Sequence, residues 1–261
     1  LPSNPLSIME VCGTHTVSIA RFGLRSLLPS HIRLISGPGC PVCVTAQGDI
    51  DLVIMLAREG GGHKKCIIAT FGDMMRVPGS DSSLMQEKAR GADVRMVYSP
   101  ADALAMAAEN PDAEVVFFAV GFETTSPTIA ATILRARQAN IGNFSIISNH
   151  KLIPPAMHVL LEDTTTAIDG FLCPGHVSAI IGIKPYQTIV ERYRKGCVVS
   201  GFEPLDIVIS TYRLMLQIQE GVPRAEIEYS RVVQAEGNAK ALELLSYQHD
   251  RELVQSLLKD H

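Results

Sequence analysis

Short apolar runs rich in β-branched residues recur along the chain, and each is followed by turn-forming residues and then by a segment of helical periodicity. Eight runs predict β-strands, at residues 8–12, 32–37, 65–72, 94–99, 113–121, 144–149, 168–173 and 196–201. Strands that alternate with helices are typical of parallel sheets joined by crossover helices. The pattern therefore predicts an α/β fold.

Helix signals lie between the predicted strands. Ser99 and Ser126 each offer an N-cap hydroxyl with a proline at the next position. Gly91 and Gly221 stand where helices are expected to end. Residues 47–59 predict a helix shortly after two closely spaced cysteines.

The strand–helix units fall into two successive sets of four. We therefore expect two α/β domains of similar plan, at residues 1–110 and 111–221, each with a parallel sheet flanked by helices. The two domains are expected to face each other across a cleft. Residues 222–261 are polar with helical periodicity and predict a helical C-terminal extension.

Composition narrows the class of protein. The chain has 261 residues, of which 46% are hydrophobic but only 5% aromatic, so we expect a globular fold with an aliphatic core. The formal net charge of -4 and the lack of a basic stripe argue against a nucleic-acid partner. No apolar run reaches the roughly 18 residues that a membrane span needs, and no leader pattern opens the chain, so we expect a cytoplasmic protein with reduced cysteines unless they cycle. Phosphate-loop and nucleophile-elbow motifs are absent, which disfavours a nucleotide enzyme or an α/β-hydrolase.

Polar and special residues gather where the predicted strands end. In open parallel sheets the ligand crevice lies outside the carboxyl ends of the strands, so we expect these residues to line the cleft. They are Cys12, His15, Cys40, Cys43, Asp73, Arg76, Glu123, His150, Lys151, Cys173, His176, Glu203 and Asp206.

Cys40 and Cys43 stand three positions apart on a turn introduced by Gly37, Pro38 and Gly39. The spacing suits a redox pair, two ligands of one soft metal, or two structural side chains. The N-terminus of the predicted helix at residues 47–59 would favour a thiolate in either chemical role.

Cys12 and His15 form a C-x-x-H motif that can offer sulfur and imidazole to one metal. Together with Cys40 and Cys43 they would make a Cys3His zinc site. The alternative is that Cys12 is a small buried side chain and His15 a hydrogen-bonded surface histidine.

The second half of the chain repeats the C-x-x-H spacing at Cys173 and His176, of which His176 is the better candidate because the turn after a buried strand explains Cys173. Cys66 and Cys197 lie inside predicted strands, where we expect them to be buried and inert.

Three charged residues complete the candidate site. Asp73 and Arg76 would pair and position an anion or a partner, or form only a surface salt bridge. Glu123 stands at a helix start, where its carboxylate can relay protons; the alternative is that the adjoining hydroxyls serve only as helix caps.

Seven motifs together resemble the HypD family of hydrogenase maturation factors. In order they are "MEVCGTHT", "LISGPGCPVCVT", "ATFGDMMRVPGS", "VFFAVGFETTSPT", "HKLIPPAM", "DGFLCPGHVSAIIG" and "SGFEPLDI". The likeness covers nearly the whole chain and is highly specific.

The resemblance implies a scaffold that, with the partner HypC, holds iron during assembly of the Fe(CN)2CO unit of [NiFe]-hydrogenase. HypE, supplied by HypF, would deliver cyanide. It also implies that Cys12 is an iron ligand and that Cys40 and Cys43 form a thiol/disulfide redox pair. His15, Asp73, Glu123 and His176 would line the same cleft. Iron with cyanide and carbon monoxide suits a soft thiolate ligand, and a nearby dithiol can store electrons.

Two departures from the family pattern stand out. Val17 occupies the place of a second motif histidine, and no cysteine follows Cys197, whereas typical members carry a [4Fe-4S] cluster in a cysteine-rich C-terminal region. No cluster is therefore predicted here. A non-catalytic docking relative with structural zinc at Cys12, His15, Cys40 and Cys43 is the alternative interpretation, and the sequence does not decide whether the protein is an enzyme.

Overall fold

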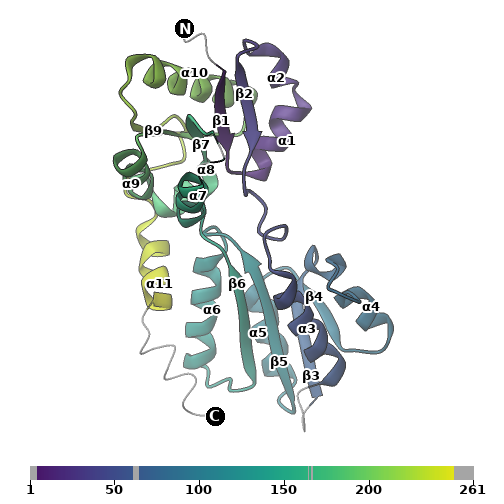
Figure 1. Ribbon diagram of the computed structural model, residues 1–261. Helices are drawn as coiled ribbons and strands as arrows, with labels where there is room; N and C mark the ends of the chain where they lie inside the picture. The colour runs from purple at the N-terminus through teal and green to yellow at the C-terminus, as the bar shows by residue number, and fades with distance from the viewer. Residues whose placement is uncertain (1–4, 61–64, 164, 166, 250–261) are drawn as a thin grey trace. The chain divides into compact units, whose positions relative to one another are not determined.

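The computed structural model describes residues 5–60, 65–163, 165 and 167–249 (Figure 1). It confirms the α/β fold, with two parallel sheets of five and four strands. All eight predicted strands are present, with bounds close to those expected, and a ninth short strand follows them. Among the described residues, no helix combines the length and the apolar character that crossing a bilayer requires.

The chain forms two compact units. Unit 1 comprises Leu1–Cys40 and Leu152–Glu243, and unit 2 comprises Pro41–Lys151 and Leu244–His261. This division differs from the boundaries predicted after residues 110 and 221. A repeating strand–helix pattern does not specify which strands pair, and here the first strand pairs with the seventh.

The sheet of unit 1 has the order β2-β1-β7-β8-β9, and its strands are parallel. Both central strands β7 and β8 are buried along their whole length, which explains their continuous apolar sequences. The strand bounds are β1 Leu6–Glu10, β2 Ile32–Ser36, β7 Gly170–Pro174, β8 Gly196–Ser200 and β9 Ala225–Ile227.

The apolar core of unit 1 joins this sheet to three helices. Ile19 of α1 (Gly13–Arg21), Leu24 of α2 (Leu24–Leu27) and Leu214 of α10 (Pro204–Glu220) pack in one cluster with Ile8 and Val198 of the strands. The remaining helices described in this unit are α7 Ile153–Glu162, α8 Gly175–Ile181 and α9 Lys184–Tyr193.

The sheet of unit 2 has the parallel order β4-β3-β5-β6. Alternate residues of its strands belong to two separate clusters: Ile68 and Phe118 pack with α3 and α4, whereas Ile67 and Phe117 pack with α5 and α6. The sheet is therefore covered on both faces. The bounds are β3 Lys65–Phe71, β4 Val94–Val97, β5 Ala113–Gly121, β6 Phe144–His150, η1 Met74–Arg76, α3 Gln47–Glu59, α4 Leu84–Ala89, α5 Pro100–Glu109 and α6 Ser126–Gln138.

The predicted helix ends are confirmed in part. Ser99 caps α5 in a capping box with Asp102, and Gly221 ends α10 with a φ of 67°. Ser126 is instead the first residue of α6, and its hydroxyl donates to the Phe122 carbonyl.

The predicted C-terminal extension is only partly helical. Within residues 222–249 the chain first adds β9 to the sheet of unit 1 and then forms α11 (Ala239–His249). Residues 250–261 of the prediction lie outside the described residues.

Each sheet has one point where the strand order reverses direction. In unit 1 this point lies between β1 and β7, and in unit 2 it lies between β3 and β5. Ligands of open α/β sheets bind at such switch points, beyond the carboxyl ends of the two strands. The residues that follow β1, β7, β3 and β5 are those at which the sequence places its candidate chemistry.

Candidate functional site

Cys12 lies just beyond β1 and is the N-cap residue of α1. Its Sγ lies 3.4 Å from Nε2 of His176, which belongs to α8 directly after β7. The two C-x-x-H motifs therefore meet at the switch point of unit 1, although 164 positions separate these residues. Cys173 is fully buried in β7.

His15 lies one turn further along α1 and is fully buried. Its Nε2 is 2.9 Å from the carbonyl oxygen of Gly201, to which the Nε2–H donates. Burial lowers the pKa of His15 to about 4, so the imidazole is neutral at pH 7. Its Nδ1 is buried and has no hydrogen-bond partner among the described residues.

Phe202 joins the two histidines. Its ring stacks on His176 with centroids 4.6 Å apart and an interplanar angle of 17°, and its centroid is 4.8 Å from that of His15. Sequence reasoning missed this residue, although "SGFEPLDI" had drawn attention to its neighbours Glu203 and Asp206. We call Cys12, His15, His176 and Phe202 the Cys12 cluster.

Burial controls the charges of the Cys12 cluster. It raises the pKa of the Cys12 thiol, against the lowering effect of the backbone N–H groups of His15 and Thr14. Burial likewise lowers the pKa of His176. The thiol and both imidazoles therefore favour their neutral forms.

A buried carboxyl group, Glu10, lies directly before this loop at the end of β1. It accepts hydrogen bonds from the hydroxyls of Thr16 (2.8 Å) and Ser36 (2.6 Å), while burial raises its pKa. Glu10 thereby ties the start of α1 to the end of β2, from which the Cys40 segment departs. Glu10 lies inside the motif "MEVCGTHT", but the sequence gave no reason to assign it a role.

The segment that leads to Cys40 packs on the Cys12 loop. The Gly13 N–H donates to the Gly39 carbonyl at 3.1 Å. A Cβ at Gly39 would collide with the backbone of Cys12 and Gly13, so only glycine allows this approach. Cys40, the next residue in the chain, therefore follows directly on the contact between Gly39 and the Cys12 loop.

Cys40 and Cys43 are both disulfide-bonded, whereas Cys12, Cys66, Cys173 and Cys197 are free thiols. Cys197 is buried as predicted, but Cys66 is only half-buried. Cys43 is exposed, and Cys40 is partly buried.

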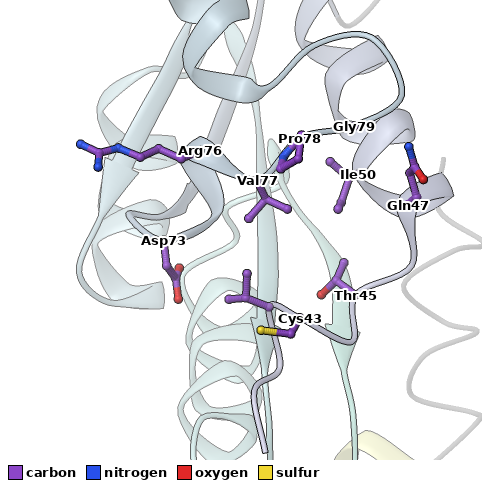
Figure 2. Close-up of a pocket in the computed structure, with 10 residues that line it drawn as sticks. Cys43, Thr45, Gln47, Ile50, Asp73, Arg76, Val77, Pro78 and Gly79 are labelled. Atoms are coloured by element: carbon purple, nitrogen blue, oxygen red, sulfur yellow. The ribbon is translucent and has the colours of Figure 1, made fainter. Parts of the chain in front are cut away.

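Unit 2 has a pocket of about 530 Å³ beside Cys43 (Figure 2). Asp73 and Arg76, which follow β3, contribute to its wall together with mainly apolar residues; in Figure 2 the Arg76 side chain extends away from Cys43. The predicted pairing of Asp73 with Arg76 is not formed, because no ion pair joins them in the described structure and Asp73 instead caps η1 through the Met74 N–H. The other lining residues are Val42, Thr45, Gln47, Ile50, Val77, Pro78 and Gly79.

Glu123 follows β5 and is 2% exposed, but it does not line this pocket. Beside it, Thr125 Oγ1 lies 3.0 Å from Nε2 of His150, and burial lowers the pKa of His150 to about 4. That Asp73 and Glu123 share one cleft with His15 and His176 stays a prediction.

The described residues contain no larger group of side chains that could ligate a metal ion. Across residues 5–60, 65–163, 165 and 167–249, no group of three or more His, Cys, Asp and Glu side chains is arranged to hold a metal ion. Of the four residues of the alternative zinc site, Cys12, His15 and Cys40 belong to unit 1 and Cys43 to unit 2, so that site stays a prediction.

Comparison with known proteins gives a consistent match. The family model described as "HypD: Hydrogenase formation hypA family" matches residues 2–253. The chain is 49% identical over 247 residues to the hydrogenase maturation factor HypD of Rhodobacter capsulatus, covering 95% of this chain and 64% of that protein. It is 48% identical over 242 residues to HypD of Escherichia coli, covering 93% and 64%, and 45% identical over 252 residues to HypD of Cupriavidus necator, covering 94% and 65%.

The chain thus spans slightly less than two thirds of the length of these relatives. Within that span the match includes the segments that form the Cys12 cluster and the Cys43 pocket. The chain therefore belongs to the HypD family of hydrogenase maturation factors.

Proposed function

We propose that this protein holds iron during assembly of the Fe(CN)2CO unit of [NiFe]-hydrogenase, with HypC as its partner and with Cys12 as an iron ligand. The observation that carries the proposal is the Cys12 cluster, in which one free thiol and two neutral imidazoles meet at the switch point of unit 1. Iron is here the cargo, handed on once its ligands are in place.

The chemistry of the donors fits iron. Thiolate sulfur and imidazole nitrogen are suitable ligands for iron in its lower oxidation state. The Nε2–H of His15 donates to the Gly201 carbonyl, which is the second-shell arrangement typical of metal-binding histidines, and its buried Nδ1 is left with a lone pair. His15 is therefore the second candidate ligand beside Cys12.

Iron binding requires that the Cys12 thiol lose its proton. The Nε2 of His176, 3.4 Å from the sulfur, is a hydrogen-bond partner that can receive that proton. This is the catalytic role that we propose for His176.

We further propose that Cys40 and Cys43 supply electrons for ligand assembly. The Gly39 contact brings the start of the Cys40 segment to the Cys12 loop, and the exposed Cys43 borders a pocket that a reductant can enter. Reduction of the disulfide takes up two electrons and two protons, and its re-formation returns them. We assign Asp73, in the wall of the Cys43 pocket, and Glu123, after β5, to the catalytic residues of this assembly step. HypE, supplied by HypF, would deliver cyanide to the complex.

The test is an anaerobic preparation of the complex with HypC, examined by infrared spectroscopy for cyanide and carbon monoxide bands. We expect these bands in the wild-type complex and their loss in Cys12→Ala. Cys197→Ala is the matched control, since it removes another free buried thiol away from the cluster, and it should keep the bands. Bands that survive Cys12→Ala would refute the ligand assignment.

A thiol titration tests the redox proposal separately. Cys40 and Cys43 should pass between disulfide and dithiol forms while the far-ultraviolet circular dichroism of the protein stays unchanged. A pair that can be reduced only after unfolding would rule out electron storage.

A further inference from the structure

The loop after β8 carries both groups that orient the histidines of the Cys12 cluster. The Gly201 carbonyl accepts the hydrogen bond from His15, and the Phe202 ring stacks on His176. Neither the Gly201 carbonyl nor the Phe202 ring is a proposed metal ligand. Both groups instead orient an imidazole, that of His15 and that of His176 respectively. The question is what holds this loop in place.

Asp206, near the start of α10, holds the loop from behind. Its buried carboxylate, 4% exposed, accepts the backbone N–H of Glu203 at 3.1 Å. A Cβ at Gly201 would collide with Asp206 Oδ2, so the loop packs directly against this carboxylate. Asp206 therefore supports the loop that carries the Gly201 carbonyl and Phe202. Glu228 supports the same loop, since it accepts the Gly201 N–H at 3.3 Å.

Arg231, beyond β9, fixes Asp206 in turn. Its guanidinium donates to both carboxylate oxygens, at 2.9 Å to Oδ1 and 2.6 Å to Oδ2. It also lies over the Tyr229 ring at 4.5 Å, and Tyr229 meets Phe202 edge to face at 6.0 Å. Arg231 thus supports Phe202 along two routes, through the carboxylate and through the aromatic ring.

This ion pair differs from an ordinary surface pair. Exposed salt bridges contribute little to stability, because solvent screens both charges. Here one partner is buried and the contact is bidentate, the geometry that only arginine provides. Loss of Arg231 would leave a buried carboxylate with fewer donors directly behind the loop that orients both histidines.

We propose that the Asp206–Arg231 ion pair is a positioning device for the metal site: through Gly201 and Phe202 it orients His15 and His176 around the Cys12 thiol. The inference rests on the proposed metal-binding function and assigns Arg231 to it. Supporting residues behind metal ligands typically change metal affinity by about 10-fold to 100-fold when they are removed. We expect a loss of about tenfold for Arg231→Ala.

The experiment uses Co²⁺ alone as a spectroscopic substitute for Fe²⁺, titrated into the whole chain under anaerobic conditions. Binding is followed by the near-ultraviolet charge-transfer absorption of a cobalt–thiolate bond. Cys12→Ala should lack this band. A wild-type band identical to that of Cys12→Ala would overturn the proposed metal site and this inference with it.

Arg224→Ala is the matched control. Arg224 lies in the same unit, makes ion pairs with Glu220 and Glu226, both at 2.9 Å, and is exposed to a similar degree, 42% against 49% for Arg231. Measured at a temperature at which both variants are folded, Arg231→Ala should bind Co²⁺ about tenfold more weakly than Arg224→Ala, and Arg231→Lys should recover only part of the affinity.

Equal Co²⁺ affinities of Arg231→Ala and Arg224→Ala, with a Cys12-dependent band in both, would overturn the inference and leave the metal site intact. Phe202→Leu serves as the second variant, because it keeps an apolar side chain but removes the ring that stacks on His176. It should weaken Co²⁺ binding without abolishing the band. An unchanged affinity in Phe202→Leu would equally contradict the positioning role, even where Arg231→Ala does not fold.

Discussion

The substitution Glu87→Gln should cost unit 2 far more stability than the substitution of its exposed neighbour Asp81. Glu87, at 4% side-chain exposure, accepts hydrogen bonds from Arg58 (2.9 Å), Arg90 (2.7 Å) and the Ser82 hydroxyl. Hydrogen bonds from Arg58 and Ser82 lower its pKa to about 2. The carboxylate form of Glu87 is therefore strongly favoured in the folded state.

The size of the effect follows from that shift. A fall in pKa from 4.5 to about 2 corresponds to about 3 kcal/mol of folding free energy at neutral pH. The Arg58 and Arg90 side chains are 36% and 62% exposed, so solvent screens part of their attraction to Glu87. We therefore expect Glu87→Gln to lower the unfolding free energy by about 2 kcal/mol. Because the folded-state pKa is depressed, this contribution is present above pH 4.5 and is lost as the pH falls toward 2.

Asp81→Asn is the matched control, since Asp81 binds the same Arg58 at 3.0 Å but is 66% exposed. It should cost less than about 1 kcal/mol. The assay is urea unfolding followed by far-ultraviolet circular dichroism at pH 7 and pH 3, because the chain has no tryptophan for fluorescence. The difference between wild type and Glu87→Gln should shrink at pH 3. Equal costs for the two substitutions, or a difference that does not change with pH, would refute the reasoning.

Three further outcomes follow from contacts described above. Gly39→Ala should destabilise the fold by about 1 to 3 kcal/mol in urea unfolding, because the added methyl group meets backbone, and a cost near zero would contradict the close approach to Cys12. Iodoacetamide should leave Cys173 unmodified in the folded protein, since this thiol is fully buried and burial raises its pKa, and mass spectrometry showing early labelling would contradict that burial. Ser99→Ala should lower the unfolding free energy by about 1 kcal/mol through loss of the capping box, whereas Ser99→Asp should largely retain it.

Local patterns predicted much of the fold. The strands and the helix Gln47–Glu59 were found because apolar periodicity and turn residues act over short stretches of chain. The boundaries of the two units could not be predicted in this way, because the pairing between β1 and β7 joins residues about 160 positions apart and leaves no signal in the local sequence.

The candidate site shows the same limit. The two C-x-x-H motifs could be recognised individually, and strand-end logic placed them at a crevice. Phe202 and Arg231 could not be found in this way, since an aromatic ring and an arginine have no spacing that marks them as supports for a histidine. Glu10 was missed for another reason, because inside an apolar strand it looks like an ordinary polar interruption.

The path of the chain through the two sheets bears on how the protein is made. The four strands of unit 2 lie together between residues 65 and 150, so they can pair soon after they leave the ribosome. Strand β1 is synthesised before the strands of unit 2, but its second edge can pair only after β7 has been synthesised. During that interval an apolar strand edge is open to incorrect pairing, and nascent chains halted near residue 150 should therefore be the most prone to aggregate.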